Sequence, residues 1–428
     1  MDKWKQFEHY VEELMAKQQI PGVAIALSKN GETIYAKGFG TKDLQTKEPI
    51  TPETIFGIAS ITKSFTALAI MKLVEEGKLE VDDAVSKHLP EFQTIQHEMV
   101  EGIKIHHLLS HTTGLATMER KNHLKNFTGH LDYLNAKKWS WLGVPGEYIC
   151  YNNDMFLLLG AIIEKVTGES YQAYITKTIF TPLQMDRTSF DLLELQQLGN
   201  LTTPYMIEKE KPTACAWPTL GNYAVGGGIR STVMDLLKYG QMYVNDDLQY
   251  KETLAQMTNT VIRTHGNSFY GYALQTTPNY EGFTLAEHGG SQPGVSSNFG
   301  FVREKELVAV VLTNLSGVSA DEIWLAAVNT ALDIPMEHKR NVEPEYDLSE
   351  EKFEPFVGTY TSDERSDVEI SVANKKLVCT IDGVTHVLRA SSERTLVITE
   401  LEKPIRFFFD NTKKTWALLL GNRMLLKK

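Results

Sequence analysis

The stretch Phe56-Gly57-Ile58-Ala59-Ser60-Ile61-Thr62-Lys63 opens an apolar segment that continues from Phe65 to Val74 and ends before Gly77. Its composition predicts a buried helix that begins near Ser60. With Ser60 in the first turn, Lys63 lies on the same face, and the helix N-terminus favours negative charge on the serine oxygen. A lysine held in an apolar site can lose its proton near neutral pH and act as a base toward that hydroxyl. The stretch therefore predicts a central helix with a nucleophile at its start.

The Ser-x-x-Lys pattern carries little weight by itself, because about two copies are expected by chance in a chain of this length. It does occur twice, and the second copy is Ser349-Glu350-Glu351-Lys352. We interpret that copy as a helix cap in a linker. The assignment of Ser60 therefore depends on other motifs.

The second motif is Tyr151-Asn152-Asn153, which stands directly before an apolar helix predicted from Met155 to Val166. A tyrosine near a lysine amine can pass a proton between a serine and a leaving group, and a nearby amide can hold a substrate carbonyl. The pattern Tyr-x-Asn also occurs at residues 133–135 and 243–245, where it fits helix or surface positions. Tyr151 and Asn153 are the candidates for chemistry.

The third motif is His288-Gly289-Gly290-Ser291, which leads into a predicted strand from Ser297 to Val302. Paired glycines let a strand edge approach a ligand closely, and the backbone N–H of Ser291 could hold an oxyanion. The alternative is a plain bulge or turn before the strand.

Around these motifs the hydrophobic pattern predicts an α+β fold. A hairpin is expected from Val23 to Ala36 with its turn at Asn30-Gly31, and two more strands run from Ser297 to Val302 and from Leu307 to Thr313. A helix follows from about Ala320 to Leu332, and the long middle of the chain is helical. Strands from both ends then form one antiparallel sheet flanked by helices, with an all-helical subdomain.

The last part of the chain changes to a β pattern. Residues 1–338 are expected to form the larger domain with the three motifs, 339–351 a linker rich in proline and acids, and 352–428 a small antiparallel β-barrel of lipocalin type or a sandwich. This module carries no catalytic motif of its own, and its charged residues are interpreted as solvated faces. We expect it to restrict access to the active site or to mediate contacts between subunits.

Composition excludes several classes of protein. The 428 residues are 42% hydrophobic and 23% charged, which is typical of a globular chain, and the net charge of -11 argues against nucleic acid as a partner. The three cysteines are far apart, so neither a disulfide framework nor a cysteine zinc site is indicated. His107 and His111 have the i,i+4 spacing of metal ligands, with His106 beside them, but no carboxylate accompanies them. The sequence predicts no metal and no cofactor.

Location is a further expectation. The N-terminus is interpreted as an amphipathic helix rather than a signal peptide, and no apolar run reaches the roughly 20 residues that span a bilayer. We therefore expect a cytoplasmic protein without a membrane span, with export left open for a chain that has lost a leader. A small molecule or short peptide is the expected partner, and homo-oligomerisation is left open.

Together the three motifs resemble those of the serine β-lactamase and penicillin-binding-protein superfamily. The chain is most similar to the group of class C β-lactamases, D-peptidases and β-lactamase-like carboxylesterases. Further matching stretches are residues 105–115, 181–185, 226–232 and 289–294, and the resemblance covers about residues 5–335.

The resemblance implies an acyl-enzyme mechanism. Ser60 would attack a carbonyl, and Lys63 and Tyr151 would pass its proton to the leaving group, with the choice between them as acylation base left open. Asn153 would orient the substrate, and the N–H groups of Ser60 and Ser291 would hold the oxyanion. Water would then release the acyl group, with Tyr151 as the base.

His288 departs from the pattern, because many β-lactamases and carboxypeptidases have a lysine there that faces the substrate carboxylate. A histidine with a pKa near 6.5 is a weaker, pH-dependent cation. This favours an esterase, or a peptidase acting on D-amino-acid amides or peptides, over efficient penicillin hydrolysis. The alternative function is a penicillin-recognising binding or sensor protein on the same fold, with little turnover.

Overall fold

The computed structural model describes residues 2–93, 100–245, 251–364 and 366–428. Eight antiparallel strands form the central sheet in the order β2-β1-β12-β11-β10-β9-β8-β7. Their bounds are β1 Gly22–Lys29, β2 Glu32–Gly40, β7 Ile262–Arg263, β8 Phe269–Tyr270, β9 Gln275–Tyr280, β10 Phe283–Gln292, β11 Val295–Val302 and β12 Leu307–Thr313. The pairing of β1 with β12 joins the two ends of this unit, so the predicted hairpin and the predicted sheet are confirmed.

Helices cover both faces of the sheet, and β1 shows why its sequence is continuously apolar. Val23, Ile25 and Leu27 face one cluster, while Ala24 and Ala26 face another. Successive side chains of a strand point to opposite faces, so a strand buried on both faces needs apolar residues at every position. The first cluster contains α1 (Lys3–Gln18) and α14 (Ala320–Ala331), and the second contains α2 (Thr62–Glu75) and α12 (Val233–Val244).

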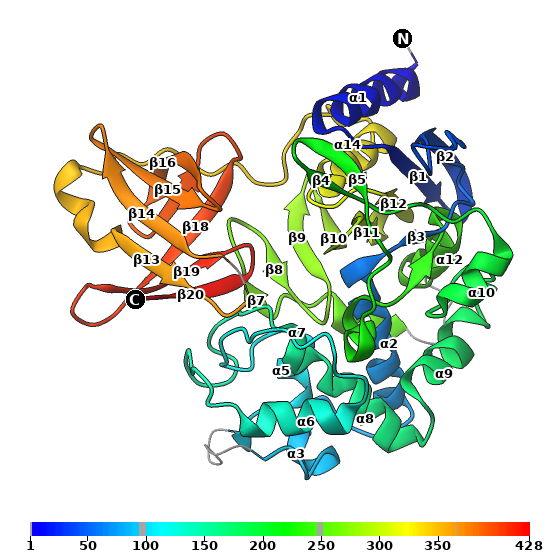
Figure 1. The fold of residues 1–428 in the computed structure, drawn as a ribbon, viewed down its shortest axis with the longest axis horizontal. Coiled ribbons are helices and arrows are strands. Elements are labelled where there is room, and N and C mark those ends of the chain that lie inside the picture. Colours follow the sequence, from blue (N-terminus) through cyan, green and yellow to red (C-terminus); the bar gives the residue numbers. More distant parts are fainter. Residues whose placement is uncertain (1, 94–99, 246–250, 365) are drawn as a thin grey trace.

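The middle of the chain forms the predicted helical subdomain (Figure 1). Its helices are α3 Val85–His88, α5 Ile105–Leu109, α6 Phe127–Ala136, α7 Asn153–Phe156, α8 Leu158–Thr167, α9 Tyr171–Ile175, α10 Leu192–Leu198, α11 Ala224–Gly227 and α13 Lys251–Met257. Two short strand pairs lie closer to the central sheet: β3 Phe56–Gly57 with β6 Arg230–Ser231, and β4 Tyr205–Glu208 with β5 Lys211–Ala214. The helix expected from Met155 to Val166 is divided between α7 and α8, and Asn152 caps its start by accepting from the Met155 N–H. Among the described residues, no helix has the length and apolarity that a membrane span requires.

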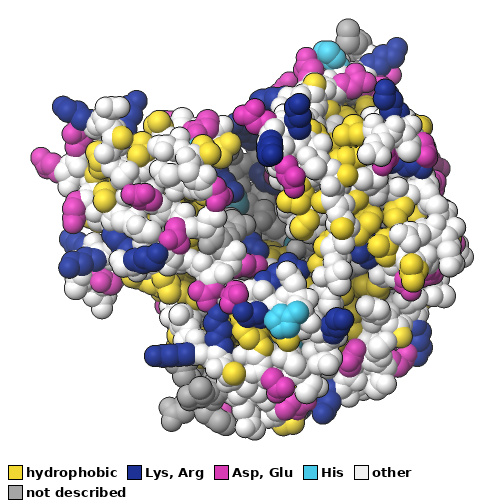
Figure 2. All heavy atoms as spheres, in the orientation of Figure 1, with side chains coloured by type: hydrophobic (Ala, Val, Ile, Leu, Met, Phe, Trp, Pro, Cys, Tyr) yellow, Lys and Arg dark blue, Asp and Glu magenta, His cyan; other side chains and the backbone are white. Residues whose placement is uncertain are grey.

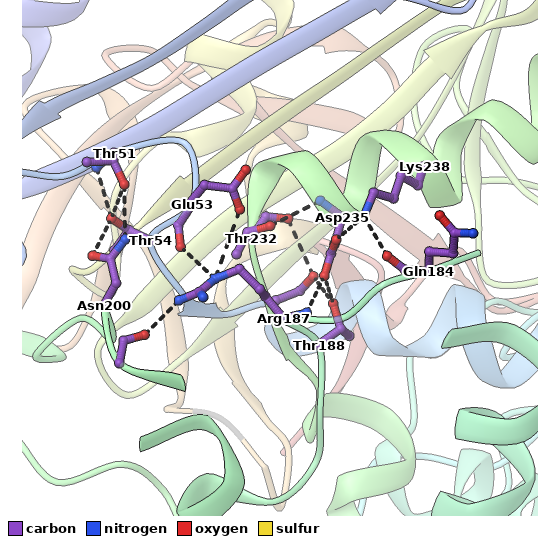
Figure 3. A network of polar contacts seen from close by, with 12 residues as sticks. Thr51, Glu53, Thr54, Gln184, Arg187, Thr188, Asn200, Thr232, Asp235 and Lys238 are labelled. Atoms are coloured by element: carbon purple, nitrogen blue, oxygen red, sulfur yellow. Dashed lines mark hydrogen bonds and ion pairs between the residues drawn. The ribbon is translucent and has the colours of Figure 1, made fainter. Parts of the chain in front are cut away.

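A buried polar network anchors the segment before α12 (Figure 3). The Asp235 carboxylate accepts from the Arg187 N–H and from the Thr188 hydroxyl, both at 2.9 Å, and pairs with Lys238 at 2.9 Å. A buried carboxylate needs such compensation, because it loses its hydration on folding. Asp235 N–H in turn donates to Thr232, which caps α12. The network therefore ties the start of α12 to the segment that contains Arg187 and Thr188.

The C-terminal part is a closed eight-stranded antiparallel barrel, as the sequence predicts. Its strands are β13 Gly358–Thr361, β14 Val368–Ala373, β15 Lys376–Ile381, β16 Val384–Ser392, β17 Thr395–Ile398, β18 Lys403–Phe409, β19 Thr415–Leu420 and β20 Arg423–Lys427. Ser349 precedes a short 3-10 helix, Glu350–Lys352, but its side chain makes no capping hydrogen bond. The limits 1–338 and 352–428 for the two domains stay predictions.

The barrel packs against the larger unit on the side of β7 and β8 (Figure 1). One apolar cluster joins them: Tyr151 and Tyr270 of the larger unit pack with Ala417, Leu419 and Met424 of the barrel. The turn between β19 and β20 is thereby brought next to Tyr151, and the Tyr151 N–H donates to the Asn422 carbonyl at 2.7 Å.

Candidate active site

Ser60 and Lys63 are brought together as predicted. Ser60 is the middle residue of a 3-10 turn, Ala59–Ile61, that leads into α2. Ala59 before it has φ +47°, a left-handed conformation that is strained for a residue with a Cβ and recurs at functional sites. Lys63 Nζ lies 3.2 Å from Ser60 Oγ and donates to the Gly226 carbonyl at 2.9 Å. A Cβ on Gly226 would stand 2.8 Å from Lys63 Nζ, so a larger residue there would force the amine to move from its place.

The surroundings of Lys63 favour the neutral amine. The side chain is 1% exposed, and no ion pair with a carboxylate is found for it among the described residues. Burial lowers the pKa of Lys63 well below its usual value, the positive charges of Arg423 and Arg120 lower it further, and Glu364 partly opposes them. A neutral amine next to a hydroxyl is a proton acceptor, which is what a base for Ser60 requires.

Tyr151 lies across from Lys63, with the lysine Nζ 5.0 Å from the centre of the tyrosine ring. Its hydroxyl is buried and has no hydrogen-bond partner among the described residues. Ser60 is near enough to lower the pKa of Tyr151 slightly, although the two oxygens do not meet the geometry of a hydrogen bond. Burial outweighs this effect and raises the pKa of Tyr151 above its ordinary value of 10.0, so the phenol is protonated.

Asn153 is directed elsewhere in this structure. It is the first residue of α7, and its Nδ2 donates to Glu364 Oε1 of the C-terminal part at 2.7 Å. It is not among the residues that line the cavity next to Ser60. Its role as a substrate ligand stays a prediction.

The His288-Gly289-Gly290-Ser291 motif forms part of β10 and borders the nucleophile. A Cβ on Gly290 would stand 2.4 Å from the Ile58 carbonyl, so this glycine permits the close approach that the motif predicts. The Ser297 hydroxyl on β11 also donates to Ile58 O, at 2.9 Å, and ties the sheet edge to the turn before Ser60. Gly289, Gly290 and Ser291 all line the cavity.

The expectation that His288 is a pH-dependent cation is wrong. His288 is 5% exposed; its Nδ1 lies 2.6 Å from the Gly289 carbonyl and its Nε2 lies 2.9 Å from the Tyr270 hydroxyl. A carbonyl only accepts, so Nδ1 carries the hydrogen and Nε2 accepts from Tyr270. Burial, with the charge of Lys63, lowers the pKa of His288 to about 3. The imidazole is therefore neutral near pH 7.

A cation beside Tyr151 comes from the barrel, and the sequence analysis missed it. Arg423, at the start of β20, lines the cavity with Ser60 and Tyr151, and its guanidinium carbon lies 4.7 Å from the centre of the Tyr151 ring. Its Nε pairs with Glu364 at 2.9 Å. The alternating pattern of the barrel gives no signal for this role, because Arg423 simply follows a Gly-Asn turn in the sequence.

The cavity has a volume of about 500 Å³ and lies where the two units meet. Figure 2 shows the hollow between the barrel and the larger unit. At its far end Arg340 pairs with Glu287 at 2.8 Å. A cavity of this size accommodates a small molecule or a short peptide end.

The three histidines near residue 110 do not form the geometry of a helical metal site. Helix α5 ends at Leu109, so His107 and His111 do not share a helix face. His107 Nδ1 accepts from the Lys104 N–H, and His111 Nδ1 accepts from the Asn152 N–H. The His111 ring packs under Tyr151, with 4.0 Å between ring centres. In the described parts of the chain, no group of three or more potential metal ligands is found.

Comparisons of the sequence with known proteins find relatives of β-lactamases and penicillin-binding proteins. The family model described as Beta-lactamase matches residues 7–332. Protein flp of Staphylococcus aureus (strain NCTC 8325 / PS 47) is 31% identical over 359 residues, which are 79% of this chain and 68% of that protein. Penicillin-binding protein 4* of Bacillus subtilis (strain 168) is 26% identical over 435 residues, which are 95% of this chain and 94% of that protein.

Two solved structures match this chain over its full length, and a third matches it over 77%. An octameric penicillin-binding protein homologue from Pyrococcus abyssi is 30% identical, with a TM-score of 0.75 and complete coverage of both chains. SurE, at 19% identity, covers 100% of this chain and 99% of its own with a TM-score of 0.77. A class C β-lactamase, at 24% identity, covers 77% of this chain and 94% of its own with a TM-score of 0.65. The last two show a shared fold alone.

Proposed function

The chain belongs to the β-lactamase family, and from that premise we propose that it is a serine hydrolase that forms an acyl-Ser60 intermediate. The family is generally hydrolytic. The observation that carries the proposal is the contact of the buried Lys63 amine with the Ser60 hydroxyl at the edge of a cavity. A lysine with a lowered pKa next to a serine is an activated nucleophile pair.

In acylation, the neutral Lys63 amine takes the proton of Ser60 as Ser60 Oγ bonds to the substrate carbonyl carbon. The N–H groups of Ser60 and Ser291 hold the resulting oxyanion. The intermediate then expels the leaving group, which receives the proton from Lys63 through the Tyr151 hydroxyl. Lys63 is favoured over Tyr151 as the acylation base, because burial lowers the pKa of the amine and raises that of the phenol.

In deacylation, the same groups act in the opposite direction. A water molecule gives a proton to the Tyr151 oxygen while Tyr151 passes its own to Lys63, and the water oxygen bonds to the acyl carbon. The bond to Ser60 Oγ breaks, Lys63 returns the proton to that oxygen, and the acid product leaves. Tyr151 thus relays the proton and is not required to be a phenolate at any stage.

The cavity favours a substrate with a carboxylate close to the scissile bond. His288 is neutral, and Arg423 supplies a cation beside Tyr151. A guanidinium binds a carboxylate through two parallel hydrogen bonds. Among the small esters, amides and D-amino-acid-containing peptides that the family suggests, we therefore propose peptides or amides with a carboxylate end as the preferred substrates.

The first experiment measures turnover of a p-nitrophenyl ester together with intact-protein mass spectrometry. Steady turnover with an acyl adduct on Ser60 is expected, and Ser60→Ala abolishes both. The matched control is Ser349→Ala, which changes the second Ser-x-x-Lys copy at an exposed position and leaves turnover unchanged. A stoichiometric burst without turnover would support the binding or sensor protein instead, and a chain that forms no adduct would contradict both functions.

The second experiment compares substrates side by side: short-chain esters, D-amino-acid amides, D-Ala-D-Ala peptides and a chromogenic cephalosporin. The highest kcat/KM is expected for the peptides with a free carboxylate. Equal values for a peptide and its C-terminal amide would contradict the role given to Arg423.

We also propose self-association, since the homologue from Pyrococcus abyssi is octameric. Light scattering of the purified protein tests this, and a mass equal to one chain at all concentrations would contradict it. The cytoplasmic location expected from the sequence stays a prediction.

A further inference from the structure

A second cavity, of about 580 Å³, lies between the larger unit, the linker and the barrel. The loop that begins at Arg263 forms one wall, residues 341–344 form another, and the barrel supplies the rest. Gly421 and Asn422 of the β19–β20 turn line this cavity and also the one that contains Ser60. The turn therefore separates two cavities.

The lining of the second cavity is strongly basic. Arg263, Arg394 and Arg406 all line it, and none of them takes part in an ion pair among the described residues. Glu343 is the only acid among the described lining residues, and its Oε2 accepts from the Ser391 hydroxyl at 2.7 Å. The three guanidinium groups therefore outnumber the carboxylates of the cavity.

Arg263 and Arg394 both line the cavity with Arg406 and are near enough for their charges to act on it. Burial lowers the pKa of Arg406, and the charges of Arg263 and Arg394 lower it further. All three arginines are exposed, so water screens part of their repulsion, and an anion bound by them would neutralise the rest. Each guanidinium also presents several N–H donors in a plane that matches phosphate and carboxylate oxygens.

We propose that this cavity binds a small multivalent anion bearing phosphate or carboxylate groups, with Arg263, Arg394 and Arg406 as its ligands. Binding of the anion does not require the acyl-enzyme chemistry at Ser60. Two sources fit the same chemistry: a free anion, or the distal anionic end of a substrate whose reacting end lies beside Ser60.

Calorimetric titration of the full chain with pyrophosphate, and separately with citrate, at low salt tests the site. We expect saturable binding that weakens as salt is added, because the contacts are between charges. The variant Arg394→Gln/Arg406→Gln is expected to lower the affinity at least tenfold, since each guanidinium contributes charge-assisted hydrogen bonds. The matched control is Lys413→Gln, which removes one exposed positive charge from the barrel outside the cavity and leaves the affinity unchanged.

The proposal is overturned if the wild-type protein binds neither pyrophosphate nor citrate at millimolar concentration. It is also overturned if the folded Arg394→Gln/Arg406→Gln variant binds them with the affinity of the wild type. Binding to Ser60→Ala is expected to equal that of the wild type, so failure of this site and failure of the hydrolase function are told apart. Both sources of the anion are then distinguished by turnover. If the site holds the distal end of a substrate, pyrophosphate should raise the KM for a substrate with a distal phosphate and leave the KM for a short neutral ester unchanged. If the site holds a free anion, pyrophosphate should change the KM for both substrates.

Discussion

Arg423 of the barrel stands over the ring of Tyr151, with 4.7 Å between the guanidinium carbon and the ring centre. The neighbouring Asn422 accepts the Tyr151 N–H, so the backbone and the side chain of one turn both contact one active-site residue. After burial itself, the charge of Arg423 is the strongest influence that lowers the pKa of Lys63. The barrel therefore forms part of the candidate site around Ser60 and Tyr151.

Arg423→Gln is expected to move the acid limb of the kcat/KM profile to higher pH. The positive charge of Arg423 lowers the pKa of Lys63, so its loss raises that pKa, and the free amine forms only at higher pH. A shift of about one pH unit is expected for one nearby charge. The double variant Arg423→Gln/Glu364→Gln should return the limb toward the wild type, because Glu364 acts on Lys63 with the opposite sign. An unchanged limb in Arg423→Gln would show that Lys63 does not respond to the barrel.

Lys63→Met is expected to stop acylation while the protein stays folded. Methionine fills a similar volume beside Gly226 but cannot accept a proton, so kcat should fall by about 10³-fold or more. Tyr151→Phe removes the relay and should lower kcat by about 10²-fold, a smaller effect. Stopped-flow measurement of the first turnover separates the two variants. A larger loss in Tyr151→Phe than in Lys63→Met would assign the acylation base to Tyr151.

His288→Gln should leave the pH profile between 5 and 8 unchanged in shape. Burial lowers the pKa of His288 to about 3, so this imidazole does not titrate in that window, and glutamine can still accept from the Tyr270 hydroxyl. Any loss of rate should be uniform across the window. Disappearance of a limb with a midpoint near 6.5 would instead show that His288 is charged during turnover.

Buried histidines should make the fold sensitive to acid. His288 and His130 have folded-state pKa values lowered from 6.5 to about 3 and about 4, so between about pH 6 and pH 4 the unfolded chain binds protons that the folded chain does not. The contribution of each neutral histidine to the free energy of unfolding is complete above its pKa in the unfolded chain. This contribution decreases as the pH falls, by up to about 1.4 kcal/mol per pH unit for each group. The melting temperature should fall accordingly between pH 7 and pH 4.5.

Asp154→Asn should make this acid sensitivity steeper. Burial raises the pKa of Asp154 to about 7. Between about pH 4 and pH 7, the folded chain therefore keeps a proton on Asp154 that the unfolded chain has released. The contribution of Asp154 to the free energy of unfolding increases as the pH falls, opposite to that of the histidines. Asparagine can still accept from the Tyr223 hydroxyl but removes this compensation. Asp132→Asn, at an exposed site on α6, is the control and should match the wild type. Equal slopes in all three proteins would show that Asp154 is ionised in the folded state.

The sequence by itself determined what depends on neighbours along the chain. The spacing of Ser60 and Lys63 places them together because a helix brings residues three apart onto one face, and the paired glycines at 289–290 allow the sheet edge to approach. The apolar runs and alternating patterns of the sequence determined the sheet, the helical subdomain and the barrel. A strand buried on both faces needs a continuous apolar run, and a strand buried on one face needs alternating apolar and polar residues.

The tertiary structure alone decided the electrostatics of the site. The charge state of His288 depends on burial and on Tyr270, and the availability of Asn153 depends on Glu364. The cation beside Tyr151 is Arg423 from the barrel. None of these partners is near its target in the sequence. A pKa depends on the charges and the solvent that surround a group in space, and the docking of the barrel against Tyr151 and Tyr270 sets both for this active site.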